Sequence, residues 1–159
     1  MYSVRKIFEK DAPLLRAIAK KCFPLDVHTQ YTYWVVARYY GDKGFVLEYN
    51  GQPIGYIMTI ESSNVTFIWQ IGILSEYRNH GLSYQLIDAV VRCAKSINNR
   101  MEVTIDESNI SCYFAFYKYC IKNGFEFNRI GMTNICDLDD VEFYENEIIY
   151  TITFNNGNS

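Results

Sequence analysis

One short run of residues has the composition of a phosphate-binding turn. Residues 78–83, Arg-Asn-His-Gly-Leu-Ser, separate an apolar segment at 65–73 from a long helical periodicity. The first amides of a helix lack partners within the helix, and the helix dipole is positive there. Small residues such as Gly81 and Ser83 let phosphate oxygens approach those amides, and Arg78 adds a positive charge. The run therefore predicts a diphosphate site, although a glycine in such a turn can also serve packing alone.

The spacing of apolar residues predicts the elements that would position this run. Apolar residues recur at helical spacing from Leu82 to Ile97, which indicates the strongest helix of the chain. Further helices are expected at 11–22, 30–40 and 109–124, and strands at 2–8, 45–49, 53–60, 65–73, 101–105, 125–132 and 147–154. The order β-α-α-β-β-β-α-β-α-β-β mixes an antiparallel meander with a β-α-β crossover, which predicts an α+β fold with a mixed sheet.

Turn and cap residues set the expected ends of these elements. Asn50-Gly51 is typical of a type I′ hairpin turn. Asp11 is expected to cap the first helix, because Asp is a preferred N-cap residue and Pro13 follows in the first turn. Asn109 or Ser111 is expected to begin the last helix, and Gly124 to end it.

Composition limits the classes of partner. The 159 residues suit one domain, assigned to residues 1–154, with 155–159 as a disordered tail. The net charge of −3 argues against nucleic acid or an anionic membrane as a partner, since both favour a basic surface. Five cysteines without a CxxC pair, and only two histidines, argue against a structural metal site. With no signal-like or membrane-spanning run, a cytoplasmic protein is expected.

The phosphate-binding run resembles a known signature. Residues 78–83 are similar to the Arg/Gln-x-x-Gly-x-Gly/Ala signature of the GNAT superfamily of N-acetyltransferases, which also follows the third strand of a meander. A strand, then Asn109, then a helix closing at Gly124-Phe125 match the second half of that superfamily. The resemblance implies a mixed, mostly antiparallel sheet of about six to seven strands flanked by about four helices. It also implies acetyl-CoA as co-substrate and no metal.

The same resemblance implies roles for particular residues. The backbone N–H of Ile71 would stabilise the oxyanion that develops on the thioester carbonyl, and Asn109 would steady the pantetheine arm. Two positions depart from the superfamily: Ser83 replaces a Gly or Ala, and Phe116 replaces a Tyr that can protonate the leaving thiolate. The implied cofactor-binding residues are Ile71, Gly72, Ile73, Arg78, Asn79, His80, Gly81, Leu82, Ser83, Asn109 and Phe116.

Three segments resemble one branch more closely, the L-2,4-diaminobutyrate acetyltransferases of ectoine biosynthesis. Residues 25–33, LDVHTQYTY, are similar to its Leu-Asp-Val-Asn-Ser-x-Tyr-x-Tyr stretch, residues 67–71 to its Phe-x-Trp-Gln-Val strand, and residues 147–150 to its Glu-x-x-Tyr strand. That branch also has Phe at the position of Phe116. Here His28 replaces an Asn of the branch and Thr29 a Ser, and the region 128–142 differs.

This closer resemblance implies an acceptor site. Asp26 would pair with an ammonium group of the substrate, while Trp69 and Tyr31 would line the pocket. An alkylamine has a pKa near ~10 and is mostly protonated at pH 7, so a base must remove a proton before it attacks. Glu147 is the candidate base and a further substrate-binding residue, and Ile71 is the other catalytic group.

Simpler interpretations stay open for each of these residues. Asp26 could be a helix cap, Trp69 a core aromatic, Tyr31 ordinary helix packing, and Glu147 an exposed edge residue. The acceptor could instead be a polyamine, an antibiotic, a peptide N-terminus or a lysine. The departures at positions 83 and 116 also leave open a non-catalytic acyl-CoA-binding domain. The expected partner is a small-molecule amine, and a homodimer is left open.

Overall fold

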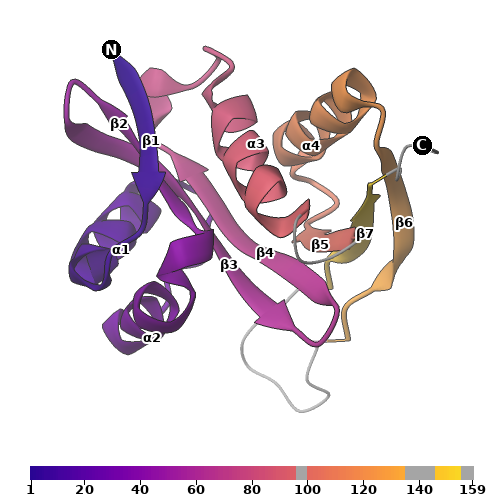
Figure 1. Ribbon diagram of the computed structural model, residues 1–159, viewed down its shortest axis with the longest axis horizontal. Coiled ribbons are helices and arrows are strands. Elements are labelled where there is room, and N and C mark those ends of the chain that lie inside the picture. The colour runs from indigo at the N-terminus through magenta and orange to yellow at the C-terminus, as the bar shows by residue number, and fades with distance from the viewer. Residues whose placement is uncertain (96–99, 135–145, 155–159) are drawn as a thin grey trace.

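The chain forms a seven-stranded sheet with helices on both faces (Figure 1). The computed structural model describes residues 1–95, 100–134 and 146–154, so the tail predicted at 155–159 lies outside the described part. The strands are β1 (Tyr2–Lys6), β2 (Phe45–Tyr49), β3 (Gln52–Ser62), β4 (Val65–Ile73), β5 (Arg100–Ile105), β6 (Glu126–Met132) and β7 (Ile148–Thr153). The helices are α1 (Ala12–Lys21), α2 (Gln30–Tyr40), α3 (Leu82–Lys95) and α4 (Ile110–Asn123). Short 3-10 turns are η1 (Glu9–Asp11), η2 (Gly41–Lys43) and η3 (Ser75–Tyr77).

The strand order is β1-β2-β3-β4-β5-β7-β6, and every neighbouring pair is antiparallel except β4 with β5. This confirms the predicted order of elements and the α+β class with a mostly antiparallel sheet. No helix in the described part of the chain is long and apolar enough to cross a membrane.

The parallel pair of strands is short, and this creates an opening in the sheet. The register pairs residues 66–68 of β4 with residues 101–103 of β5, and Ile68 opposite Val103 is the last pair. β4 then continues to Ile73 and β5 to Ile105. The carboxyl ends of these two strands therefore separate at one edge of the sheet.

Two apolar layers hold the helices against the sheet. On one face, α3 and α4 bury residues such as Leu86 and Phe116 against the sheet, each with no exposed area. On the opposite face, α1 and α2 bury residues such as Leu15 and Tyr33 in a second cluster. Figure 1 shows the two helix pairs on opposite sides of the long strands β3 and β4.

Most of the predicted turn and cap residues have the expected geometry. Asn50 and Gly51 both have positive φ angles, 49° and 78°, as a type I′ turn requires. Asn109 caps α4 by accepting a hydrogen bond from the Cys112 amide at 3.2 Å. Gly124 ends α4 in the left-handed region, at φ 70°.

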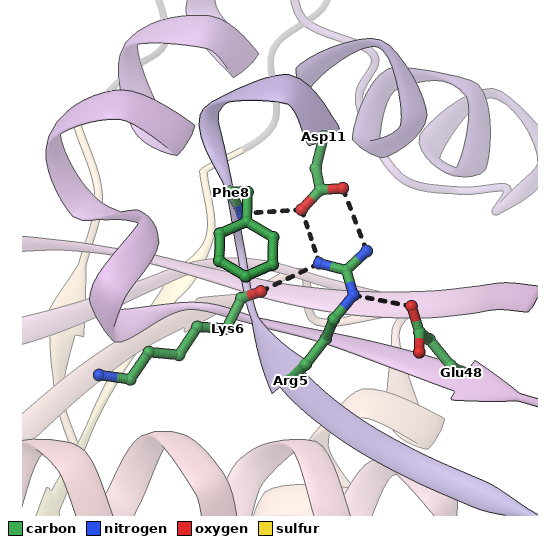
Figure 2. A network of polar contacts seen from close by, with 5 residues as sticks. All are labelled: Arg5, Lys6, Phe8, Asp11 and Glu48. Carbon is green, nitrogen blue, oxygen red and sulfur yellow. Dashed lines mark hydrogen bonds and ion pairs between the residues drawn. The ribbon is translucent and has the colours of Figure 1, made fainter. Parts of the chain in front are cut away.

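The prediction for Asp11 was right about its position and wrong about its hydrogen bond. Asp11 occupies the N-cap position of α1, but its carboxylate makes no capping bond to that helix. The carboxylate instead accepts the Phe8 amide at 2.7 Å and two hydrogen bonds from Arg5, at 2.7 and 3.1 Å (Figure 2). The same guanidinium donates from Nε to Glu48 of β2 at 2.7 Å. The ion pair with Arg5, six residues away in the sequence, therefore outcompetes a cap of α1. Through its second bond, to Glu48, Arg5 also ties β1 and η1 to β2.

The charge of Asp11 should stabilise the protein at neutral pH. Burial alone would raise the pKa of this carboxyl, but the hydrogen bonds from Arg5 and the Phe8 amide outweigh burial and lower the pKa below its ordinary value. A lowered pKa contributes stability above the unfolded pKa of ~3.9, and this stability is lost as the pH falls through the folded value. We expect Asp11→Asn to cost about 2 kcal/mol at pH 7, by urea unfolding, and progressively less below about pH 4.

Glu9→Gln is the matched control. Glu9 also pairs with an arginine, Arg38, but both side chains are about half exposed. We therefore expect it to change the free energy of unfolding little, because exposed pairs are screened by solvent. A loss for Asp11→Asn that is equal at all pH values would show that the carboxylate charge is not the source of the stability.

Candidate active site

The predicted cofactor loop, Asn109 and Glu147 lie at the edge where β4 and β5 separate. Because these strands are parallel, their carboxyl ends lie at the same edge, and the helices that follow them begin there. The cofactor loop (residues 78–83) leads from β4 into α3, and Asn109 leads from β5 into α4. β7 runs antiparallel to β5 and starts with Ile148 opposite Ile105, so Glu147 lies at this edge too.

The open side of β4 presents the backbone of Ile71. The Leu74 amide donates to the Ile54 carbonyl at 2.9 Å, which marks a hydrogen-bonded pair with β3. Such pairs alternate along an antiparallel ladder, so the N–H and C=O groups of Ile71 and Ile73 point away from β3. Arg78 Nε donates to the Ile73 carbonyl at 2.8 Å, in agreement with this direction. The Ile71 N–H therefore faces the opening left by β5, where the prediction requires an oxyanion donor.

A β-bulge in β4 explains the opening. Met58 of β3 lies opposite Gln70, and the next residue, Thr59, lies opposite Ile68, so Trp69 is an extra residue. A bulge disrupts the ladder locally and bends the strand. Trp69 packs with the α1/α2 cluster, and Gln70 forms hydrogen bonds with residues of that cluster. Two consecutive side chains of β4 therefore point to the same face of the sheet. The sequence analysis missed this bulge.

The cofactor loop has the shape of an open anion cradle. Asn79 and Gly81 both adopt left-handed backbone conformations, with φ of 64° and 70°. The turn closes when the Tyr84 amide donates to the Gly81 carbonyl at 3.2 Å, so the amides of residues 81–83 precede the helical ladder. A methyl group on Gly81 would meet no other heavy atom of the described chain within 4 Å. The space beside the Gly81 α-carbon is therefore free of described protein atoms, and a phosphate can approach the loop from that side.

Three other predicted loop residues take different positions. Arg78 is exposed, but its Nε is held on the end of β4, and its guanidinium also contacts the thiol of Cys22. Burial raises the pKa of Cys22 and the arginine partly opposes that shift. His80 is exposed, with Nδ1 3.3 Å from the Tyr77 carbonyl. Ser83 lies in the first turn of α3 and is half-buried.

Gly72 has a packing function in addition to any role towards the cofactor. A β-carbon at this position would lie 2.8 Å from Leu25 Cδ1 and 3.4 Å from Cys22 Sγ. The glycine therefore lets the segment that joins α1 to α2 close against β4. Its neighbours Ile71 and Ile73 are half-buried on the other face and pack against the α3/α4 cluster.

The acceptor segment (residues 25–29) joins α1 to α2 and lies over β4. The carbonyl of Asp26 accepts a hydrogen bond from Gln70 Nε2 at 2.6 Å, and the Asp26 side chain is exposed. The ring of His28 lies 5.1 Å from the ring of Trp69, measured between centroids. The structure thus brings Asp26, His28 and Trp69 together, although the sequence analysis gave His28 no role in the site.

Within the described part of the chain, the side chain of Tyr31, predicted to bind the amine substrate, makes no ring contact or hydrogen bond with the residues of the acceptor segment. Its side chain is 72% exposed, and its ring lies 5.8 Å from that of Trp34. Among the contacts of the described residues, none joins Tyr31 to Asp26 or Trp69. Its role in substrate binding stays a prediction.

Glu147 is half-buried and well anchored. Its Oε2 accepts a hydrogen bond from Thr104 Oγ1 at 2.6 Å, and its backbone exchanges hydrogen bonds with Thr133 at 2.9 and 2.8 Å. Burial and the negative charge of Glu147 raise the pKa of Cys112 to about 12, so the carboxylate lies near the first turn of α4. The hydrogen bonds to Thr104 and Thr133 give a base at this position a fixed orientation.

Phe116 does not reach this edge as a surface group. Its ring is completely buried, 6.3 Å from the ring of Phe127, and belongs to the α3/α4 core. Tyr113 instead borders a hollow of about 180 Å³ between the end of β5, the start of α4 and β7. Contact between Phe116 and the cofactor stays a prediction.

Comparisons with known proteins show which family the chain resembles. The model of the acetyltransferase (GNAT) family matches residues 12–120. The L-2,4-diaminobutyric acid acetyltransferase of Vibrio parahaemolyticus is 25% identical over 118 residues, which are 72% of this chain and 65% of that protein. Its counterpart from Streptomyces coelicolor is 25% identical over 148 residues, 89% of this chain and 86% of that protein. The chain spans slightly less than two thirds of the length of the first curated relatives, 65% and 66%.

Solved structures share the fold. Diaminobutyrate acetyltransferase EctA from Paenibacillus lautus, solved with L-2,4-diaminobutyric acid and coenzyme A, superposes with a TM-score of 0.86 at 19% identity. The superposition covers 96% of this chain and 95% of that one. The ribosomal-protein-S18-alanine N-acetyltransferase of Escherichia coli has a TM-score of 0.76 at 18% identity, over 100% and 99% of the two chains. At these identities the likeness extends to the fold alone.

Proposed function

The chain belongs to the acetyltransferase (GNAT) family, and from that premise we propose that it moves acetyl from acetyl-CoA to a primary amine of a small molecule. The acceptor we propose is a diamino acid such as L-2,4-diaminobutyrate, the substrate in the names of the relatives above. The observation that carries the proposal is the open cradle at Gly81 on the same sheet edge as Glu147.

The cofactor would be held by backbone groups of this chain. The amides of residues 81–83 would bind the pyrophosphate, since they are unpaired within α3 and the dipole is positive there. Asn109 uses its Oδ1 to cap α4, which leaves its Nδ2 to donate to a pantetheine carbonyl. Acetyl-CoA supplies the activated acyl group, and the Ile71 N–H is the donor for the negative charge that develops on the thioester oxygen.

Glu147 would remove the proton that prevents the amine from attacking. A carboxylate is a weak base towards an alkylammonium, so the site must favour the neutral amine, whose proton would reach Glu147 directly or through a water. The hydrogen bond from Thr104 occupies Oε2 and leaves Oε1 to accept that proton. On the other side of the site, Asp26 would pair with the second ammonium of a diamino acid, beside the wall formed by Trp69 and His28.

A thiol-release assay with acetyl-CoA tests the proposal. We expect turnover with 2,4-diaminobutyrate, and a lower kcat/KM for ornithine by about tenfold, because one extra methylene misplaces one of the two amines. Lysine, spermidine and an aminoglycoside should be poorer still. If diaminobutyrate is inert while another of these amines turns over, the acceptor is wrong but acetyl transfer holds. If coenzyme A binds and no amine turns over, the chain is a non-catalytic acyl-CoA-binding domain.

A further inference from the structure

Gln70 is a buried polar side chain that no predicted role accounts for. It lies in the interior of an apolar strand and is 5% exposed. Burying an amide in an apolar layer is costly unless its hydrogen-bonding groups are satisfied. In this protein three hydrogen bonds satisfy it, and each comes from a different element of the fold.

The three bonds divide into two functions. Gln70 Oε1 accepts from the hydroxyls of Tyr33 in α2 at 3.0 Å and Tyr56 in β3 at 2.7 Å. Burial raises the pKa of Tyr56, so its hydroxyl stays protonated and remains a donor. These two bonds fix the plane of the carboxamide. Gln70 Nε2 then points at the acceptor segment and donates to the Asp26 carbonyl at 2.6 Å.

The bond to Asp26 is well placed to control the acceptor side of the site. Gln70 is flanked by Trp69, which lines that side, and by Ile71, whose N–H faces the opening. The acceptor segment is also held by Arg16, whose Nε donates to the His28 carbonyl at 3.0 Å. Gln70 thus links β4, which would carry the oxyanion donor, directly to the acceptor segment, whose Asp26 carboxylate would pair with an ammonium group of the substrate.

We propose that Gln70 is a positioning residue, which sets the register of Asp26 and His28 against Trp69 and thereby determines affinity for the amine acceptor without contacting it. This inference rests on the proposed acetyl transfer to a small amine. It goes beyond that proposal because it assigns control of acceptor binding to a buried side chain in β4.

Gln70→Glu separates the two functions of the side chain. Glutamate keeps an oxygen for the two tyrosine hydroxyls, but at neutral pH it places a lone pair where the Asp26 carbonyl needs a donor. We expect the KM for the amine to rise about tenfold, while the KM for acetyl-CoA and its binding by calorimetry change less than about twofold. When the pH is lowered, a protonated glutamic acid can donate again, so the ratio of variant to wild-type amine KM should fall.

Tyr33→Phe and Tyr56→Phe are matched controls. Each removes one bond to Gln70 Oε1 and leaves the bond to Asp26 in place. We expect both to lower the Tm while the amine KM stays within about twofold of wild type. A Gln70→Glu enzyme with unchanged amine KM, or with both substrates' KM values raised equally, would overturn the positioning role.

Hydrogen exchange keeps this test independent of turnover. If wild type turns over no amine, the proposed function fails, yet the link can still be measured as faster amide exchange of residues 25–29 in Gln70→Glu than in either tyrosine variant. Equal exchange in all three variants would overturn the inference even where acetyl transfer is established.

Discussion

Replacing Gly81 with alanine should weaken coenzyme A binding about a hundredfold. The residue has a φ of 70°, and its missing side chain leaves the space in front of the α3 amides empty. An alanine methyl group would project into that space and displace an anion from the amides. Each hydrogen bond from an amide to a charged oxygen contributes about 1.5–3 kcal/mol, so the loss of one or two accounts for the expected change. Isothermal titration with coenzyme A measures it.

Gly124→Ala separates this effect from backbone strain. Gly124 has the same φ of 70°, and a β-carbon added there would also meet no heavy atom within 4 Å, but it ends α4 and is not part of the loop. Both variants should lose about 1 kcal/mol of stability, since alanine is strained in the left-handed region. Only the Gly81 variant should lose coenzyme A affinity. Equal affinities for the two variants would place the pyrophosphate elsewhere.

Glu147→Gln should lower kcat by about 10²–10³-fold and leave coenzyme A affinity unchanged. The substitution keeps the size of the side chain and its contact with Thr104 but removes a group that can accept a proton. Steady-state kinetics with the amine identified by the thiol-release assay give kcat, and isothermal titration gives the coenzyme A affinity.

Thr104→Val is the control for geometry. It removes the 2.6 Å hydrogen bond to Glu147 Oε2 but leaves the carboxylate in place. We expect a loss of about tenfold or less, since the backbone bonds with Thr133 still hold residue 147. If Thr104→Val and Glu147→Gln are equally impaired, Glu147 orients other groups and is not the base.

The fold could be predicted where local pattern and tertiary structure agree. The hairpin at Asn50-Gly51 depends on local backbone geometry and was correctly placed, and of the two caps predicted for α4, Asn109 and Ser111, the structure has Asn109. Asp11 makes no capping bond to α1 because its carboxylate binds Arg5 and the Phe8 amide instead. A cap of α1 and these bonds compete for the same carboxylate, and the residue types alone do not rank them.

The site was predictable at its cofactor end and less so at its acceptor end. The cofactor loop can be recognised in the sequence from its glycine and its place before a helix. The bulge at Trp69 does not, because an inserted residue changes the phase of a strand without changing its composition. Gln70 could have been found, since a lone amide within an apolar strand demands partners. Its partners Tyr33 and Tyr56 could not have been named, because they come from elements that meet only in the folded chain.

The extra residue in β4 also bears on which insertions and deletions this chain can accept. Losing a single residue from most positions of a strand reverses the facing of every side chain beyond it. Trp69 is the exception, because its loss would put Gln70 directly after Ile68 and restore regular alternation on both sides. The α1/α2 layer would lose the Trp69 ring, but every remaining residue of β4 would keep its face, and the straightened strand would extend its ladder with β5 and close the opening. We therefore expect the core to survive deletion of Trp69, while the opening between β4 and β5 is lost.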